Sequence, residues 1–309
     1  MKIAMCQTNP VLLDVAANVE NTIEKIRKCR EEGADLIVFP ELALTGYFVG
    51  LNYHKAALQM DSSDIKRIAA ATKGTAAVVG FIEESQSMNF YNSALVAVDG
   101  NLLFAYRKLN LPNYGVFEER KFFASGKHIK VFRLCGLNIA IFICNDMWHP
   151  SLPYLGIAQK ADIFLTLFNS SEGSMADEFS NIESWEIINR FYSRIFGIYN
   201  ICVNRVGEEG PEQIRCGVPQ NGDTGFPDAF RLPEVAKTYH FWGGSEIINP
   251  FGQAIHSARK FQEDTVLGKI SKDMLRRKKI VLPYLKNDDP HFTHRELGRI
   301  LYASGENQP

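Results

Sequence analysis

The strongest constraint on the fold is a series of short apolar runs separated by segments of helical spacing. Residues 36–39 read LIVF and residues 139–143 read IAIFI, which is the pattern of strands buried on both faces. Residues 15–33 instead place apolar side chains at helical intervals and end in a glycine, a typical helix terminator. The turn signal Asp99-Gly100 separates two strand-like runs and predicts a hairpin. Helices and hairpins mixed in this way predict an α/β protein with mixed sheets and helices outside.

Composition excludes several classes of function. The chain of 309 residues suffices for one large α/β domain or two smaller ones, and 46% hydrophobic against 22% charged residues supplies a sizeable core. A formal net charge of −1 gives no attraction to nucleic acid or anionic lipid, so neither partner is expected. No apolar run approaches about 18 residues, so no transmembrane helix is expected. The N-terminal MKIAMCQTNP predicts a first strand rather than a signal peptide.

Six cysteines are scattered along the chain without a C-x-x-C pair or a cluster. This spacing argues against a zinc site and a disulfide framework, and it favours a reducing, cytoplasmic compartment. Most of these thiols are expected to be buried core residues. They are Cys6, Cys29, Cys135, Cys144, Cys202 and Cys216.

Three of the predicted buried strands end in an ionisable residue, namely Glu41, Lys108 and Cys144. The carboxyl ends of strands in such sheets line the ligand crevice, so the fold could bring the three together despite their separation in sequence. Taken singly, each has an ordinary explanation: a solvated strand end, a surface cation and an inert core thiol. Their joint occurrence favours a catalytic site.

The three side chains form a coherent set for attack on a carbonyl carbon. A thiol attacks as its thiolate, which a neighbouring base or cation favours. Glu41 is the candidate general base, and the Lys108 ammonium is suited to stabilise the oxyanion. The backbone N–H of Asn145, directly after Cys144, is a second candidate oxyanion donor. Histidine is not needed for this chemistry.

Longer segments around these residues carry a family resemblance. DLIVFPELALTGY, YRKLNLPNYGVFEERKFFASG and GLNIAIFICNDMW resemble the signature blocks of the nitrilase superfamily of carbon–nitrogen hydrolases. YNICVNRVG and FWGGSEIINPFG resemble two further blocks, and all occur in the family's order. The resemblance implies a single domain over residues 1–271 with the α-β-β-α four-layer sandwich of the nitrilase type.

The resemblance also implies roles for individual residues. A Glu-Lys-Cys triad maps onto Glu41, Lys108 and Cys144, and a supporting glutamate maps onto Glu119, with Glu118 as its neighbouring competitor. A plain surface role is the alternative for Glu119. The implied mechanism forms a thioester on the cysteine that water then hydrolyses. No metal or organic cofactor is implied.

The residues after the cysteine favour an amide substrate. Cys144, Asn145 and Asp146 stand where members resembling true nitrilases carry Cys-Trp-Glu. An arginine that many carbamoyl-amide hydrolases use to grip a carboxylate is absent nearby. The glutamate and lysine blocks look closest to the glutaminase domain of glutamine-dependent NAD synthetases, but no Gly-rich phosphate loop follows. A free-standing amidase acting on a small molecule is expected first. A stand-alone glutaminase, an N-carbamoyl amide hydrolase and a catalytically idle scaffold are the alternatives.

Weaker candidates for substrate contacts follow the same strand ends, and packing or turn geometry explains each of them equally well. The charged segment 272–309 is expected to be an arm that supports a homodimer or larger homo-oligomer. The candidate substrate contacts are Tyr47, Asn113, Tyr114, Trp148 and Asn169.

Residues 207–240 are rich in Gly, Pro and Asp and predict an insertion. Such a segment either caps the pocket or forms a surface loop or oligomer contact. Phe226, Phe230, Phe241 and Trp242 are its candidate wall residues.

Overall fold

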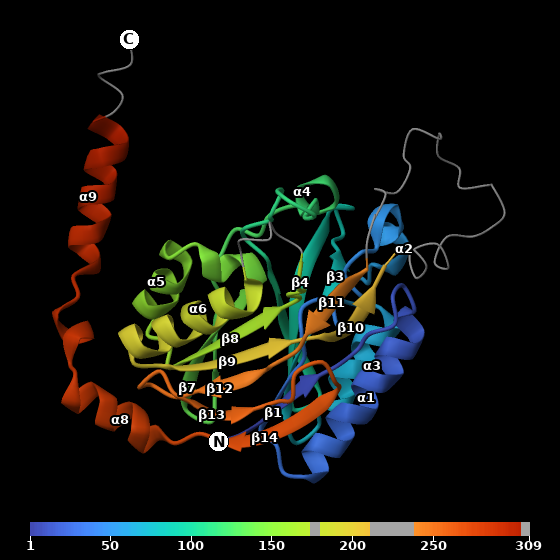
Figure 1. Cartoon of the computed structure of the whole chain (residues 1–309), viewed down its shortest axis with the longest axis horizontal. Helices are drawn as coiled ribbons and strands as arrows, with labels where there is room; N and C mark the ends of the chain where they lie inside the picture. The colour runs from blue at the N-terminus through green and yellow to red at the C-terminus, as the bar shows by residue number, and fades with distance from the viewer. Residues whose placement is uncertain (174–179, 211–237, 304–309) are drawn as a thin grey trace.

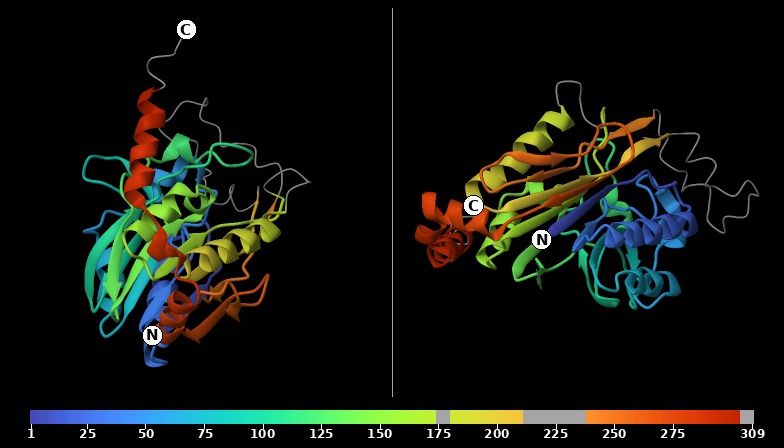
Figure 2. Two further views of the ribbon diagram at one scale, coloured as in Figure 1. Left: turned by 90° about the vertical axis from the view of Figure 1, so that its left-hand side faces the viewer. Right: turned by 90° about the horizontal axis from the view of Figure 1, so that it is seen from below.

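The computed structural model describes residues 1–173, 180–210 and 238–303. Within these ranges two six-stranded mixed sheets stack face to face, and helices cover the two outer faces (Figure 1 and Figure 2). The four-layer α/β sandwich expected from the sequence is confirmed. None of the described helices is both long and apolar enough to span a bilayer.

The first sheet has the strand order β14-β1-β2-β3-β4-β5. Its three central strands are parallel, and the flanking strands pair antiparallel to them. The predicted hairpin at Asp99 and Gly100 joins the last two strands. The members are β1 (Lys2–Gln7), β2 (Leu36–Val38), β3 (Ala76–Glu84), β4 (Phe90–Val98), β5 (Asn101–Arg107) and β14 (Asp264–Lys269).

The second sheet has the order β13-β12-β9-β8-β7-β6 and repeats this plan, with three parallel strands at its centre. Its remaining pairs are antiparallel. The members are β6 (Val131–Leu134), β7 (Leu137–Ile143), β8 (Ile163–Phe168), β9 (Tyr199–Asn204), β12 (Glu246–Ile248) and β13 (Ala254–Ser257).

The layered core explains why the strands are apolar throughout. Successive side chains of a strand point to opposite faces, so a strand between two apolar layers buries both sets. Leu36 and Val38 of β2 join the core between the sheets, whereas Ile37 packs under the outer helices. Two helices cover each sheet (Figure 2). They are α1 (Val15–Glu31) and α3 (Ser63–Ala71) on the first sheet, and α5 (Ser151–Ala158) and α6 (Asn181–Phe196) on the second.

Both ends of α6 carry local helix signals in the sequence. The helix begins at Asn181, because the Ser180 hydroxyl accepts the Glu183 N–H and caps the first turn. It ends before Gly197, whose φ of +66° suits a helix terminator. Residues 174–179 lie outside the described residues.

Only the two ends of the predicted insertion are described. They pair as the antiparallel strands β10 and β11, while Phe226 and Phe230 lie outside the described residues. Phe241 and Trp242 are each 2% exposed and pack in the interior. Neither lines the small cavity beside Cys144 described below, so the expectation that they wall the substrate pocket is not borne out. The strand bounds are β10 (Val206–Glu209) and β11 (Tyr239–Trp242).

The C-terminal segment forms helices. The first, α8, packs on the body through Leu275, which is 3% exposed, and the last, α9, extends away from it (Figure 1). Residues 304–309 are not among those described. The remaining elements are η1 (Gly50–Asn52), α2 (Tyr53–Ala56), α4 (Glu119–Phe122), η2 (Cys144–Trp148), α8 (Lys272–Val281), η4 (Tyr284–Asn287) and α9 (Pro290–Ala303).

Candidate active site

The three residues predicted from strand ends converge between the two sheets. Glu41 follows β2 and Lys108 follows β5 in the first sheet, whereas Cys144 follows β7 in the second. Lys108 and Glu41 are both fully buried. The fold thus joins residues that no local sequence motif connects.

The backbone at these strand ends is unusual. Cys144 has a φ of +46° and Leu42, next to Glu41, has a φ of +48°. Such angles are uncommon for non-glycine residues and concentrate at functional sites. Gly80 of β3 permits the close approach of the Glu41 segment, because a Cβ there would lie 2.3 Å from the Pro40 carbonyl oxygen.

Lys108 lies between two carboxylates. Its Nζ donates to Glu41 Oε1 and to Glu119 Oε1, each at 2.7 Å. Burial alone would lower the pKa of Lys108, but the carboxylates of Glu119 and Glu41 outweigh it and hold that pKa well above its usual value. Glu41 is further fixed by the Asn92 side-chain amide and by the Asn169 backbone N–H, each at 2.8 Å. The ammonium is therefore retained, and Glu41 has one orientation.

Glu119, the first residue of α4, is the supporting carboxylate. Burial raises the pKa of Glu119 to about 7, with Lys108 opposing the shift and Glu41 adding to it. The Tyr47 hydroxyl donates to Glu119 Oε1 at 2.9 Å, and Oε2 has no hydrogen-bond partner. Glu118 instead pairs with an exposed lysine at the surface. Of the two adjacent glutamates, the structure brings Glu119 to the site.

The environment of Cys144 keeps its thiol protonated. Burial raises the pKa of Cys144 well above its usual value, and the Glu41 carboxylate raises it further. Lys108 and the Asn169 backbone N–H oppose this shift without cancelling it. The sulfur therefore needs a base at the moment of attack.

Asp146 ties the two halves of the site together. Its buried carboxylate accepts the backbone N–H groups of Leu109 at 3.0 Å and Asn110 at 2.9 Å, directly after the lysine. It also accepts the N–H of Ile143, directly before the cysteine, at 3.0 Å and the hydroxyl of Tyr106 at 2.7 Å. Burial raises the pKa of Asp146 against these hydrogen bonds. The sequence prediction assigned Asp146 no role. A buried aspartate shortly after an apolar strand is nevertheless a sign of a carboxylate that holds the neighbouring backbone by hydrogen bonds.

A small cavity of about 50 Å³ lies beside Cys144. Three predicted contacts, Tyr114, Trp148 and Asn169, line it. Asn145 does so too, and its Oδ1 accepts the Tyr114 hydroxyl at 2.9 Å. Five other lining residues were not predicted: three lie beside predicted ones in the same segments, and two come from α6. These are Pro112, Phe117, Ser170, Asn181 and Trp185.

The predicted contacts differ in what they offer a substrate. The Asn169 side chain is 2% exposed, and neither its Oδ1 nor its Nδ2 has a hydrogen-bond partner. Tyr47 does not line the cavity and contacts Glu119 instead. The structure does not bring Asn113 to the cavity, since its side chain is exposed in the loop between two lining residues.

A second buried ion pair supports Tyr47 from behind. The Glu209 carboxylate, which pairs with Arg205, accepts the backbone N–H groups of Tyr47 at 3.0 Å and Phe48 at 2.8 Å. Both members of the pair are at most 1% exposed. No local sequence pattern predicts this pair, because only the tertiary fold brings β9 and β10 to the loop after Glu41.

The charged groups of the site are occupied with one another rather than arranged around an ion. Among the described ranges, no three His, Cys, Asp or Glu side chains are grouped as ligands for a metal ion. The arrangement offers a protonated thiol, an adjacent carboxylate and a fixed ammonium. Such a set is suited to attack on an electrophilic carbon that develops negative charge on a bound atom.

Comparison with known proteins defines the class. The family model of the carbon-nitrogen hydrolases matches residues 2–279. The chain therefore belongs to the carbon-nitrogen hydrolase family. The resemblance to the nitrilase superfamily expected from the sequence is confirmed.

Individual relatives show how far the similarity extends. A glutamine-dependent NAD(+) synthetase of Thermotoga maritima is 25% identical over 100% of this chain, which spans 49% of that relative's length. An N-carbamoylputrescine amidase of Solanum tuberosum is 23% identical over 86% of this chain and 85% of its own. A CN-hydrolase superfamily protein from Xanthomonas campestris, solved with an arsenic adduct in its active site, shares the fold with a TM-score of 0.76. It is 20% identical over 94% of this chain and 97% of its own.

Proposed function

We propose that this enzyme hydrolyses a small-molecule carboxylic amide through a thioester on Cys144 and releases ammonia or an amine. The observation that carries the proposal is the buried Glu41–Lys108–Glu119 network around a protonated cysteine at a small cavity. Family membership supports carbon–nitrogen hydrolysis in general. The geometry supports the assignment of individual roles.

In the first half-reaction, the Cys144 sulfur attacks the carbonyl carbon and its proton passes to Glu41. Lys108 and the Asn145 backbone N–H stabilise the negative charge that develops on the carbonyl oxygen. The C–N bond then breaks, and Glu41 returns the proton to the departing nitrogen. An acyl group remains on the sulfur as a thioester.

In the second half-reaction, water attacks the thioester carbon while Glu41 accepts one of its protons. The C–S bond breaks, the sulfur regains its proton from Glu41, and the carboxylic acid leaves. Glu41 can serve both steps because Asn92 and the Asn169 N–H hold it in one orientation. Glu119 keeps Lys108 in place throughout.

The cavity supports a small acyl group. Its aromatic wall excludes water from the reacting atoms, which strengthens the electrostatic interactions at the site. The unpartnered Asn169 amide is our candidate for binding a polar group of the substrate, since a buried amide without a partner costs about 1–3 kcal/mol. Its wall is formed by Tyr114, Phe117, Trp148 and Trp185.

Ammonia release from a panel of aliphatic amides, glutamine, carbamoyl compounds and nitriles tests this proposal. We expect release from an amide and a loss on the order of 10⁴-fold or more in Cys144→Ala. Iodoacetamide labelling reports whether Cys144 reacts, in a Cys135→Ser/Cys216→Ser background that lacks both the exposed thiol of the described residues and the one thiol outside them. Release from nitriles alone would contradict the amide assignment. An unreactive Cys144 with no release from any compound would favour an idle scaffold.

A stand-alone glutaminase that supplies ammonia to a partner is the second candidate. The alignment of this whole chain with about half of a glutamine-dependent NAD(+) synthetase favours it. Glutamine would then surpass every aliphatic amide in kcat/KM. The carbamoyl alternative draws on the N-carbamoylputrescine amidase relative and predicts release from carbamoyl compounds instead.

We further propose a homodimer or larger homo-oligomer in a reducing, cytoplasmic compartment. Ile187, Phe191 and Ile195 recur at four-residue spacing on α6 and are 62%, 51% and 41% exposed. Such an apolar stripe marks an association surface. Sedimentation showing only monomer at micromolar concentration would contradict the assembly, and Phe191→Glu should weaken it. The scattered cysteines support the compartment.

A further inference from the structure

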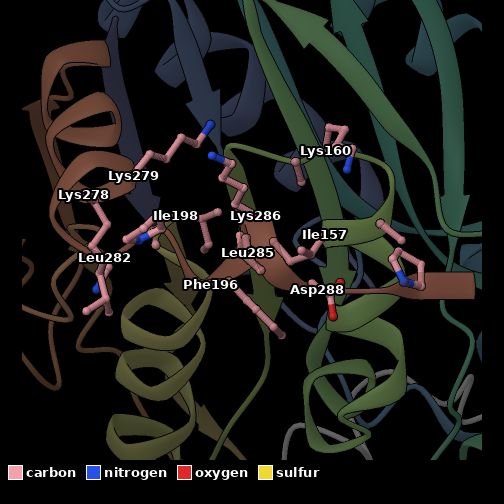
Figure 3. A pocket seen from close by; sticks show the side chains of 15 residues that line it. Ile157, Lys160, Phe196, Ile198, Lys278, Lys279, Leu282, Leu285, Lys286 and Asp288 are labelled. Atoms are coloured by element: carbon pink, nitrogen blue, oxygen red, sulfur yellow. The ribbon is translucent and has the colours of Figure 1, made fainter. Parts of the chain in front are cut away.

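A second cavity, of about 360 Å³, lies between the C-terminal ends of α5 and α6 and the α8–η4 segment (Figure 3). It shares no lining residue with the cavity beside Cys144. Its volume and its apolar walls fall within the range typical of small-molecule sites. The main wall residues are Ile157, Phe196, Ile198, Leu282 and Leu285.

Positive charge is in excess around this cavity. One acidic residue, Asp288, lines it against four lysines, and its carboxylate already accepts the Tyr154 hydroxyl at 3.0 Å. Asp162, which does not line the cavity, forms an ion pair with one of these lysines, Lys279, at 3.2 Å. A concave apolar surface concentrates the field of such charges and attracts anions. The lysines are Lys160, Lys278, Lys279 and Lys286.

Three of these ammonium groups, those of Lys160, Lys278 and Lys286, have no carboxylate within ion-pair distance among the described residues. Lys278 is 4% exposed. The Lys278 Nζ lies over the Phe251 ring, 5.2 Å from its centroid. Burial and the neighbouring Arg194 lower the pKa of Lys278. A buried cation flanked by another cation is costly unless an anion joins it.

We propose that this cavity binds a small organic anion with an apolar body and a carboxylate or phosphate head group. In Figure 3 the side chains of Lys279 and Lys286 point toward one another and give the head group its place. Lys278 adds positive potential from the side of α6, and the apolar walls take the body of the ligand. This site is independent of the proposed hydrolysis at Cys144.

The same charges argue against a second copy of the chain as the occupant. A two-fold axis that passed through the cavity would set these lysines against their own copies. Like charges brought together in this way oppose association. A small anion meets no such penalty.

Titration calorimetry on the full chain tests the site with octanoate, octyl phosphate and octanol. We expect both anions to bind, with affinities that fall as salt increases, and octanol to bind at least about tenfold more weakly. The two anions differ in their head group, so the tighter one identifies the preferred chemistry. Equal binding of octanol, or no binding of either anion, would overturn the proposal.

Variants locate the binding within the cavity. Lys286→Ala and Lys278→Met should each weaken both anions about tenfold, because each removes one positive charge. Ala158→Phe keeps every charge but fills the cavity, and it should abolish binding. Lys66→Ala, an exposed lysine of α3, is the matched control and should change nothing. Thermal unfolding checks that each variant is folded.

Two results with these variants would refute the site. One is an equal loss of affinity in Lys66→Ala and Lys286→Ala, which would indicate non-specific attraction. The other is a sedimentation result in which the Ala158→Phe variant is a monomer, whereas the wild type stays a dimer when octanoate is added. That outcome would assign the cavity to an interface between copies.

Discussion

The protein contains two buried ion networks a short distance apart, and they differ in how fully their polar atoms are satisfied. In the first, Lys108 lies between Glu41 and Glu119, and the Glu119 Oε2 has no partner. In the second, Arg205 and Glu209 saturate one another and the surrounding backbone. Tyr47 contacts both, through its hydroxyl and through its backbone N–H.

This difference in hydrogen-bond satisfaction distinguishes the candidate catalytic network from a structural ion pair. Buried polar atoms are nearly always paired, so unpaired ones need an explanation. The unpaired atoms of Glu119 and Asn169 lie in the network that includes Cys144, and Asn169 lines the cavity. Arg205 instead stacks its guanidinium on Phe241, 4.2 Å from the ring centroid.

The largest expected effect follows from removing the lysine of the first network. Lys108→Met should lower kcat by about 10³-fold or more, because an oxyanion donor is lost. The free energy of unfolding should change little, since Glu119, with a pKa of about 7, can take up a proton when the ammonium is gone. Steady-state kinetics and urea unfolding measure the two quantities. A variant that kept its kcat would remove Lys108 from the mechanism.

Breaking the second network should have the opposite signature. Arg205→Met leaves the Glu209 carboxylate buried without its cation, and we expect a loss of about 3–5 kcal/mol in the free energy of unfolding. The kcat per folded molecule should fall far less than in Lys108→Met. The double variant Arg205→Met/Glu209→Gln, which has no buried charge, should regain much of the stability. If the double variant were as unstable as the sum of its single changes, the pair would not act as a unit.

The protonation of Glu119 gives the first network a pH dependence. The folded pKa of about 7 lies above the ordinary value of 4.5, so between these values the folded state holds a proton that the unfolded state has released. Stability from this group is present below about pH 4.5 and declines as the pH rises through 7. Glu119→Gln should therefore gain on the wild type by on the order of 3 kcal/mol between pH 5 and pH 8. Urea unfolding at both values measures this gain, and Glu118→Gln is the matched surface control. A constant difference across the range would contradict the assignment.

The sequence predicted the three residues that meet at the candidate site better than the groups that hold them. Glu41, Lys108 and Cys144 could be predicted because each follows an apolar strand, and such strand ends meet at one edge of a sheet. Glu119 required the family resemblance, since its block is charged throughout. The Arg205–Glu209 pair has no local signature, because only packing decides that both side chains are buried.

The misses have the same physical origin. Asn113 follows the lysine block in sequence, but its loop turns that side chain to solvent while both neighbours line the cavity. Phe241 and Trp242 stand beside the insertion, yet β11 pairs with β10 and buries them. Sequence proximity to a motif therefore indicates the segment and leaves the direction of each side chain to the fold.

The smallest expected effect tests the one residue that the two networks share. Tyr47→Phe removes the hydroxyl that donates to Glu119 Oε1 and leaves the backbone bond to Glu209 intact. The hydroxyl favours the ionised carboxylate, so its loss should raise the pKa of Glu119 further. Glu119 also faces Lys108 and Glu41, which the substitution leaves unchanged.

The measurement is the pH profile of kcat/KM. If ionised Glu119 keeps Lys108 in place, the acidic limb of the profile should move to higher pH in Tyr47→Phe, while the plateau near pH 8 stays within about threefold. Tyr114→Phe is the matched control, because that hydroxyl bonds Asn145 rather than Glu119 and should leave the limb where it is. A rise in KM without any shift of the limb would instead make Tyr47 a substrate contact, as the sequence first suggested. The two networks would then be neighbours in space without being coupled.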